Sequence, residues 1–239
     1  MLYMKKTLLI TLVILSAGIL NAHAQFTNGN LGARHYAGAE TIKGRVAQRG
    51  GAVEEAIGSP FLNPDWGGGT VTYKDGRVFN NVEVQYNLMT NELYFKKAEE
   101  IFLFTDTVSS FQVTYSIKDE AKSEKFQAGY PAVEKLTVEQ FYQVLAEGPK
   151  VHFLLHKYVK RIESYHYSEG KKINYFPYED YYLYDVANGS MKKIKKGEDA
   201  VLEALPAYAE QIKSIIKSQK LRLKDTGDMT KLVESINRL

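Results

Sequence analysis

The chain has 239 residues, with 31 Lys and Arg against 28 Asp and Glu, 44% apolar residues and no cysteine. This composition indicates a globular protein with a packed core and excludes a disordered tail or a small disulfide-bonded scaffold. The lack of thiols excludes cysteine catalysis, thiolate metal sites and iron–sulfur clusters. A formal charge of +3 is too small to indicate nucleic acid as the partner of the whole molecule.

Residues 1–24 have the pattern of an export signal. Lys5 and Lys6 precede an apolar run, and the small-residue box Ala22-His23-Ala24 follows it. The run is shorter than the ~20 residues that a membrane-spanning helix needs, so we predict a signal peptide cleaved after Ala24 rather than an anchor. Translation would start at Met1 or at Met4. We expect an exported protein, periplasmic or secreted, with no transmembrane segment after signal removal.

Residues 25–57 are predicted to form an N-terminal extension, ordered or flexible, and residues 58–239 a single domain. Glycines interrupt every helical pattern in the extension. The domain begins with a segment rich in turn-forming residues, which contains the only tryptophan, Trp66, followed by Gly67-Gly68-Gly69. We expect these three glycines to let the chain turn past Trp66.

Alternating apolar and polar residues predict antiparallel strands through most of the domain. Two hairpins are expected to have type I′ turns, at Asp75-Gly76 and at Asn188-Gly189. The first joins a strand ending at Tyr73 to one that continues to Tyr86. Further strands are predicted at residues 92–96, 101–104, 111–117, 122–127, 152–161 and 181–186.

Three helical segments are also predicted. A capping box at Thr137–Gln140 begins an apolar pattern of helical spacing that ends at Gly148-Pro149, and this predicts an internal helix. Residues 198–220 are predicted to form an amphipathic helix interrupted near Pro206, and residues 228–239 a shorter one. Strands joined by hairpins and followed by helices indicate an α+β fold, mainly antiparallel β-sheet with one internal helix and C-terminal helices.

A glycine-rich turn, then V-x-Y-x-D-G, then V-x-V-x-Y-N, follow one another between Gly58 and Asn87. This pattern, together with the tail near Ile236-Asn237, resembles uncharacterised exported proteins of Bacteroidetes-group bacteria. The resemblance implies no particular activity.

Metal-binding and catalytic motifs are missing from the sequence. His152 and His156 are four residues apart, but no glutamate lies between them as in H-E-x-x-H, and on a strand they would lie ~13 Å apart, too far to bind one ion. No G-x-S-x-G elbow and no phosphate-binding loop are present. We therefore assign no catalytic residue, metal or cofactor. Acidic pairs that could still converge in the fold, as a glycosidase requires, are Glu99-Glu100, Asp119-Glu120 and Glu179-Asp180.

Tyrosine is the most unevenly distributed residue type, since eight tyrosines lie between residues 158 and 184. Its large ring and polar tip suit binding to peptides, sugars or proteins, although tyrosine also has a high strand propensity. We expect most of the eight to be structural and a minority to form an exposed contact patch. The candidate binding residues are Tyr165, Tyr167, Tyr175, Tyr178, Tyr181, Tyr182 and Tyr184, together with Trp66.

The second asymmetry is basic, because residues 191–224 contain nine Lys or Arg against four acids. Lysines at helical spacing are predicted to form one stripe on the C-terminal helix, opposite its isoleucines. The stripe is either an ordinary solvated face or a surface for anionic lipid headgroups or acidic polysaccharide. Its members are Lys213, Lys217, Lys220 and Lys224.

These observations predict a noncatalytic binding or assembly module at the cell envelope, whose partner is an envelope protein or a glycan. The alternative is a carboxylate-based hydrolase that acts on envelope or environmental glycans.

Overall fold

The structure, a computed structural model, describes residues 34–35, 41–47, 56–167 and 170–239. These residues form a mostly antiparallel β-sheet followed by three α-helices, which confirms the predicted α+β class. The predicted signal peptide at residues 1–24 and much of the predicted extension at 25–57 lie outside the described residues.

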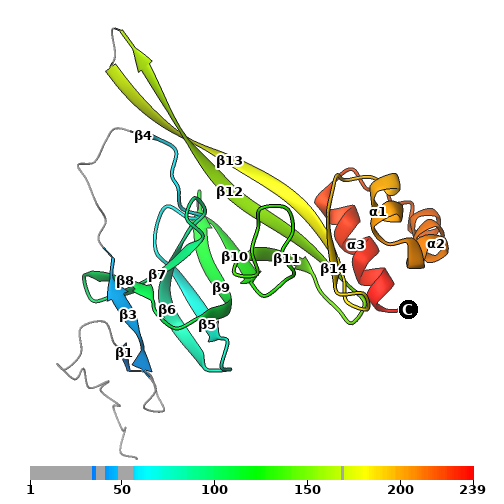
Figure 1. Ribbon diagram of the computed structural model, residues 1–239, viewed down its shortest axis with the longest axis horizontal. Helices are drawn as coiled ribbons and strands as arrows, with labels where there is room; N and C mark the ends of the chain where they lie inside the picture. Colours follow the sequence, from blue (N-terminus) through cyan, green and yellow to red (C-terminus); the bar gives the residue numbers. More distant parts are fainter. Residues whose placement is uncertain (1–33, 36–40, 48–55, 168–169) are drawn as a thin grey trace, which may run out of the picture.

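Among the described residues, a 12-stranded sheet contains all strands except β1 and β2, which pair with each other (Figure 1). Its strand order is β14-β13-β12-β11-β10-β9-β5-β6-β7-β8-β3, and β4 pairs in parallel with β13 beside this path. The strands are β1 (Arg34–His35), β2 (Thr41–Ile42), β3 (Gly44–Val46), β4 (Ala56–Ile57), β5 (Gly67–Tyr73), β6 (Val78–Asn87), β7 (Glu92–Lys97), β8 (Glu100–Phe104), β9 (Val108–Ile117), β10 (Glu120–Gln127), β11 (Tyr142–Ala146), β12 (Val151–His166), β13 (Gly170–Asp185) and β14 (Ser190–Ile194).

Strands β5 to β10 bury one face of the sheet in a first core that is rich in aromatic rings. The ring of Tyr86 lies near its centre, 5.2 Å from the ring of Phe111 and 5.3 Å from that of Phe126. Such edge-to-face and tilted ring contacts add to the stabilisation that burial of the rings already supplies. Ile42, from the predicted extension, is fully buried in the same core.

Gly67 and Gly69 belong to β5, so the prediction that they turn the chain past Trp66 is wrong. A Cβ atom at Gly67 would lie 2.5 Å from Val113 Cγ2, and one at Gly69 would lie 2.8 Å from Val84 Cγ2. The glycines therefore allow β5 to lie close against the side chains of its two neighbouring strands.

Three helices cover one face of the sheet at its β11–β14 end (Figure 1). Ile212 and Leu232 pack there with Phe153 and Leu183 in a second core. The helices are α1 (Glu198–Ala204), α2 (Ala209–Gln219) and α3 (Thr226–Asn237), and a short 3-10 helix at Pro206–Tyr208 makes the predicted interruption between α1 and α2. In the described part of the chain, no helix has the length and apolar character that crossing a membrane requires.

The side chain of Asn237 ties the end of α3 to the start of β12. Its Oδ1 accepts hydrogen bonds from the backbone N–H groups of Lys150 and Val151, at 3.0 and 2.9 Å, and its Nδ2 donates to the carbonyl of Val151 at 2.8 Å. Ile236, the preceding residue, is fully buried. Both residues of the Ile236-Asn237 tail therefore have a structural role.

The other face of β11–β13 is covered by the segment of residues 128–137 and forms a tyrosine cluster. Tyr130 of this segment lies 5.8 Å from the ring of Tyr142 and 5.3 Å from that of Tyr184. The buried members of the cluster are Tyr130, Tyr142, Leu154, Tyr182 and Met191.

The predicted internal helix after Thr137 is wrong, because this part of the chain forms a single turn and then β11. Phe141 packs in the first core whereas its neighbour Tyr142 packs in the tyrosine cluster. Adjacent residues can point to opposite faces in a strand but not in a helix. Val138, which the helical pattern placed on the apolar face, is 54% exposed. Burial on two sides of the sheet outweighed the local helical spacing.

The two predicted type I′ turns are also wrong. Gly76 and Gly189 have positive φ angles of 90° and 59°, but the residues before them do not, and type I′ requires a positive φ at both central residues. That condition is met instead at Lys118 and Asp119, with φ angles of 51° and 65°, in the turn between β9 and β10. No Asn-Gly or Asp-Gly pair marked that turn in the sequence.

β12 and β13, each of 16 residues, pair along their whole lengths, but β11 and β14 pair only with the end of the hairpin that lies against the body. β11 pairs with Phe153–Leu155 and β14 with Tyr181–Asp185. Residues 156–180 therefore project from the body as a two-stranded ribbon, beside which only the short β4 pairs, at Ile173 and Asn174; we call this ribbon the hairpin arm (Figure 1). At ~3.3 Å per residue the arm is about 35 Å long.

Candidate functional site

The register of the hairpin arm places its side chains on two faces. Each residue of β12 is opposite a residue of β13 of the same parity, for example Tyr158 opposite Tyr178 and Arg161 opposite Tyr175. Even-numbered residues share one face, which we call the aromatic face, and odd-numbered residues share the other, the cleft face. The members of the aromatic face used below are Tyr158, Lys160, Ile162, Phe176 and Tyr178.

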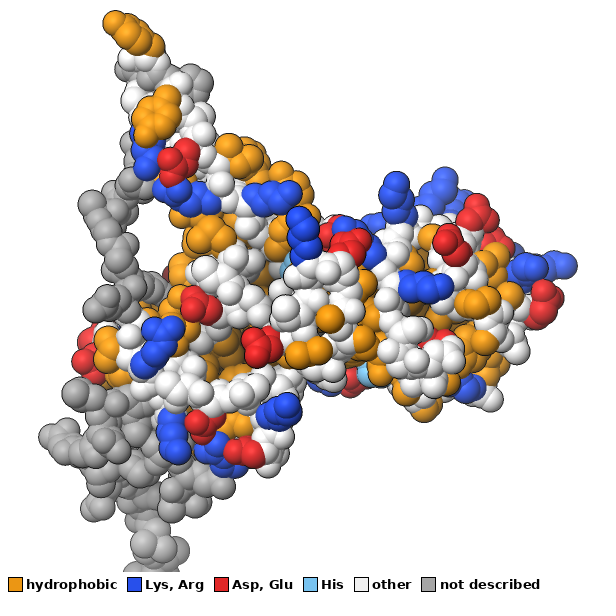
Figure 2. Space-filling view, in the orientation of Figure 1, with side chains coloured by type: hydrophobic (Ala, Val, Ile, Leu, Met, Phe, Trp, Pro, Cys, Tyr) orange, Lys and Arg blue, Asp and Glu red, His pale blue; other side chains and the backbone are white. Residues whose placement is uncertain are grey.

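The aromatic face carries stacked rings that continue outward from the tyrosine cluster. The ring of Tyr158 stacks on His156 at 4.9 Å and on Tyr178 at 5.3 Å. Lys160 Nζ lies 4.8 Å from the centroid of Tyr178, within the range of a cation–π contact. Further out, Ile162, Phe176 and Tyr178 are 44%, 43% and 39% exposed. Figure 2 shows hydrophobic side chains gathered along the arm.

The tip of the arm carries the two most exposed tyrosines of the described chain. Tyr165 is 75% exposed and Tyr167 is fully exposed. Charged side chains stand just behind the tip, where Glu163 contacts Arg161 within the strand and Lys171 across the hairpin. The tip therefore presents rings to solvent, surrounded by charges of both signs.

The predicted binding tyrosines divide between the arm and its root. Tyr182 is 1% exposed in the tyrosine cluster, and Tyr184 is half-buried beside Tyr130. Tyr181 stacks on Phe153 at 5.7 Å and its hydroxyl donates to Glu179. These three root tyrosines pack against the body, so they are poorly placed to contact a partner. Tyr165, Tyr167 and Tyr178 are exposed and Tyr175 is half-buried.

A cavity of about 370 Å³ lies between the cleft face of the arm, the ends of β9 and β10, and the loop at residues 58–62. Its volume is at the lower end of the range of small-molecule sites. Trp66 does not line it. The lining residues used here are Tyr115, Glu124, Lys157, Tyr175 and Glu179.

An ion pair joins β10 to the arm inside this cavity. Lys157 Nζ lies 2.8 Å from each carboxylate oxygen of Glu124, and both side chains are mostly buried. Burial and the neighbouring Glu124 carboxylate raise the pKa of the Tyr115 hydroxyl above its ordinary value. Because Glu124 is held by an ammonium group, it is better suited to fix the arm or to bind a polar group than to transfer protons.

The acidic pairs considered for hydrolysis occupy other surroundings. Glu99-Glu100 and Asp119-Glu120 are exposed where a turn leads into β8 and into β10. Glu179 and Asp180 are adjacent on β13 and point to opposite faces of the arm. Asp180 forms an ion pair with Lys193 at 2.8 Å.

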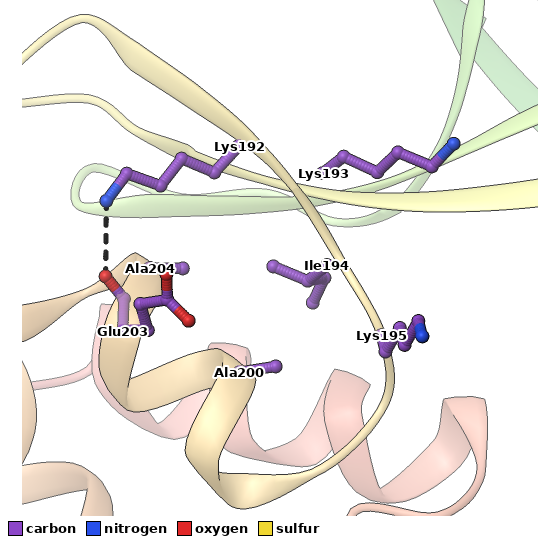
Figure 3. Close-up of a pocket in the computed structure, with 7 residues that line it drawn as sticks. All are labelled: Lys192, Lys193, Ile194, Lys195, Ala200, Glu203 and Ala204. Carbon is purple, nitrogen blue, oxygen red and sulfur yellow. Dashed lines mark hydrogen bonds between the residues drawn. The ribbon is translucent and has the colours of Figure 1, made fainter.

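A second, smaller cavity of about 240 Å³ lies between β14 and α1 (Figure 3). Lys192 Nζ donates to the backbone carbonyl of Glu203 at 3.2 Å, whereas Lys193 and Lys195 point in other directions. The ammonium groups therefore do not converge as a phosphate or carboxylate site requires.

The predicted stripe of four lysines is not continuous on one helix. α2 ends at Gln219, with Lys220 in the left-handed conformation as its C-cap. Lys213 and Lys217 lie on the exposed side of α2, and Lys213 is paired with Glu210 at 3.3 Å. Lys224 lies in the connection to α3. All four side chains are exposed, and binding of these lysines to anionic lipid headgroups or acidic polysaccharide stays a prediction.

His152 and His156 lie on β12 in aromatic surroundings. Burial lowers the pKa of His152, whose Nδ1 is 2.9 Å from the hydroxyl of Tyr130. Burial lowers the pKa of His156 to about 4, and its Nδ1 makes no hydrogen bond. Within the described ranges, no group of three or more potential ligands is placed to hold a metal ion.

No family model, curated protein or solved structure matches the chain.

Proposed function

We propose that this protein is a noncatalytic contact module of the cell envelope and that its hairpin arm carries the contact. The observation behind the proposal is the placement of exposed rings on a ribbon that leaves the body of the protein. Tyr167 is fully exposed at the tip, and Phe176 and Tyr178 are exposed along the aromatic face. Exposed aromatic groups supply much of the binding energy at protein interfaces.

The envelope location rests on the sequence of residues 1–24, which has the pattern of an export signal. Removal of these residues leaves 29 basic against 28 acidic side chains, so the remaining chain is almost neutral. An almost neutral chain with a local aromatic surface suits recognition of a specific protein better than general adhesion to a charged polymer.

The partner that best fits the arm is an envelope protein. Large rings at the centre and charged side chains at the rim are typical of protein interfaces, where arginine and tyrosine are enriched. The mostly buried Glu124–Lys157 ion pair joins β10 to the root of the arm. Because the arm is already held in place, binding costs less conformational entropy.

The test is binding of the tagged protein to its native envelope fraction. The double substitution Tyr167→Ser with Phe176→Ser should weaken binding roughly tenfold or more, since each ring is worth about 1 kcal/mol or more at an interface. Met89→Ser is the matched control, because Met89 is 42% exposed on the turn between β6 and β7. The melting temperatures of all variants are measured alongside.

Unchanged binding of the Tyr167→Ser, Phe176→Ser protein would contradict the proposal. Capture of a glycan instead of a protein would show that the partner of the arm is a glycan and would contradict the proposal of a protein partner. Release of reducing sugar from envelope glycans by the purified protein would support the hydrolase alternative.

A further inference from the structure

The outer edge of β12 is an open strand edge along the arm. β11 pairs only with Phe153–Leu155, and no other described strand pairs with β12 on that side. Open edges readily accept another strand, and an isolated two-stranded ribbon is only marginally stable in water. On the opposite side of the arm, β4 already pairs with Ile173 and Asn174 of β13. The β13 edge of the arm thus already pairs with a strand, whereas the β12 edge is open to one.

The sequence of this edge is complementary to itself when it is reversed. In Val159-Lys160-Arg161-Ile162-Glu163-Ser164-Tyr165, an arginine and a glutamate flank a central isoleucine. If two copies of this strand pair antiparallel about Ile162, Arg161 of each copy lies opposite Glu163 of the other, and the two Ile162 residues lie opposite each other.

The remaining positions also match in this register. Val159 lies opposite Tyr165, so a ring that is 75% exposed in one copy lies beside a valine of the other copy that is only 7% exposed. Lys160 lies opposite Ser164. Ile162, 44% exposed on the aromatic face, meets its own equivalent. Opposite charges and apolar pairs directly across two strands both stabilise a sheet.

Charge selects this register over its neighbours. In the symmetric pair, a two-fold axis perpendicular to the sheet keeps the aromatic faces of both copies on the same side of the sheet. Such an axis must pass between two copies of the same residue, so each alternative register is centred on a residue other than Ile162. Centring on Arg161 would place two arginines opposite each other, and centring on Glu163 two glutamates. Like charges directly opposite are unfavourable.

We propose that two copies of this protein associate through β12, by antiparallel pairing of residues 159–165 about Ile162, so that the two arms form one four-stranded sheet. Arg161 and Glu163 already contact each other within a strand, and pairing brings two such ion pairs into one cluster of four charges. This association does not depend on the envelope partner.

The absence of cysteine from the chain makes the register directly testable. Ile162→Cys places two thiols opposite each other across the axis, and mild oxidation should convert the purified protein to a disulfide-linked dimer. Ser164→Cys is the matched control on the same face, because its two copies would lie ~13 Å apart in this register. Equal cross-linking of the two variants, or none in either, would overturn the proposal.

Sedimentation equilibrium of the cysteine-free protein tests the charges. Arg161→Glu or Glu163→Arg alone should weaken the dimer roughly tenfold, because each places like charges opposite in two symmetric pairs. The double substitution should restore dimerisation, since the exchanged charges are again complementary. A protein that stays monomeric, or a dimer that tolerates either single reversal, would reject the inference. Neither result would bear on the envelope-binding test, which uses Tyr167 and Phe176.

Discussion

His156 makes the stability of this protein depend on pH in a way that one substitution can isolate. Its side chain is 7% exposed, stacked on Tyr158, with the ring of Tyr142 5.8 Å away. The charged groups that act on its pKa are Asp180, opposite it on β13, and Lys193 on β14, which are paired with each other. Asp180 raises its pKa and Lys193 lowers it, but burial has the largest effect and lowers the pKa to about 4.

The magnitude follows from the difference between the folded and unfolded pKa values. In the unfolded chain His156 has its ordinary pKa of 6.5 and binds a proton as the pH falls below that value, whereas in the folded protein it stays neutral until about pH 4. The unfolded state therefore binds more protons between these values, and stability is lost as the pH falls. At pH 5 the loss is about 2 kcal/mol, since each pH unit below 6.5 is worth roughly 1.4 kcal/mol.

The assay is urea unfolding at pH 8 and pH 5, comparing the wild-type protein with His156→Gln. Glutamine cannot titrate, so the variant lacks this contribution while His152 and the carboxylates titrate in both proteins. We expect the free energy of unfolding of the wild type to fall by about 2 kcal/mol more than that of the variant over this interval. Equal losses in the two proteins would refute the reasoning, as would an imidazole NMR titration of the folded protein with a midpoint near 6.5.

Other contacts give sharper tests of stability. Asn237→Ala removes three hydrogen bonds at the start of β12 and should cost about 2–3 kcal/mol in urea unfolding, and Asn237→Asp should also destabilise, because it replaces the donor to the Val151 carbonyl with a second acceptor oxygen. Glu124→Gln and Lys157→Met should each destabilise the protein by about 2 kcal/mol, and a double-mutant cycle should show a coupling above ~1 kcal/mol; additive effects would mean that the ion pair contributes nothing. Asp119→Gly should stabilise by about 0.5 kcal/mol, since Asp119 has a positive φ. Lys74→Gly, at a turn position without a positive φ, should show no such gain in a thermal melt.

Local patterns in the sequence were sufficient to predict the strands and helices that bury one face and expose the other. Alternation predicted the strands around the two hairpins, because each of those strands buries one face and exposes the other. The amphipathic pattern of residues 198–220 predicted a helix interrupted near Pro206, which the structure divides into α1 and α2, because both dock on the sheet by one stripe of apolar residues. These elements, arranged as hairpins followed by helices, were enough to predict the α+β class.

Local patterns failed where a segment is buried on both sides or ends for a tertiary reason. Phe141 and Tyr142 point into different cores, and only the neighbouring strands β10 and β12 make that favourable. The turn at Lys118-Asp119 adopts positive φ angles because the register of β9 and β10 imposes them. The lysine stripe stops because α2 ends at Gln219, and the left-handed C-cap Lys220 turns the chain toward α3.

The candidate site shows the same division between sequence and tertiary structure. The sequence alone determined that tyrosines are concentrated between residues 158 and 184 and that residues 159–165 are self-complementary. It could not determine which rings are exposed, because exposure depends on where the neighbouring strands end. β11 and β14 pair with only the root of the hairpin, so Tyr182 is buried there whereas Tyr167 reaches solvent at the tip. The tertiary structure thus decided that this hairpin became an arm, because β11 and β14 end at its root and only the two-residue strand β4 pairs with its outer half.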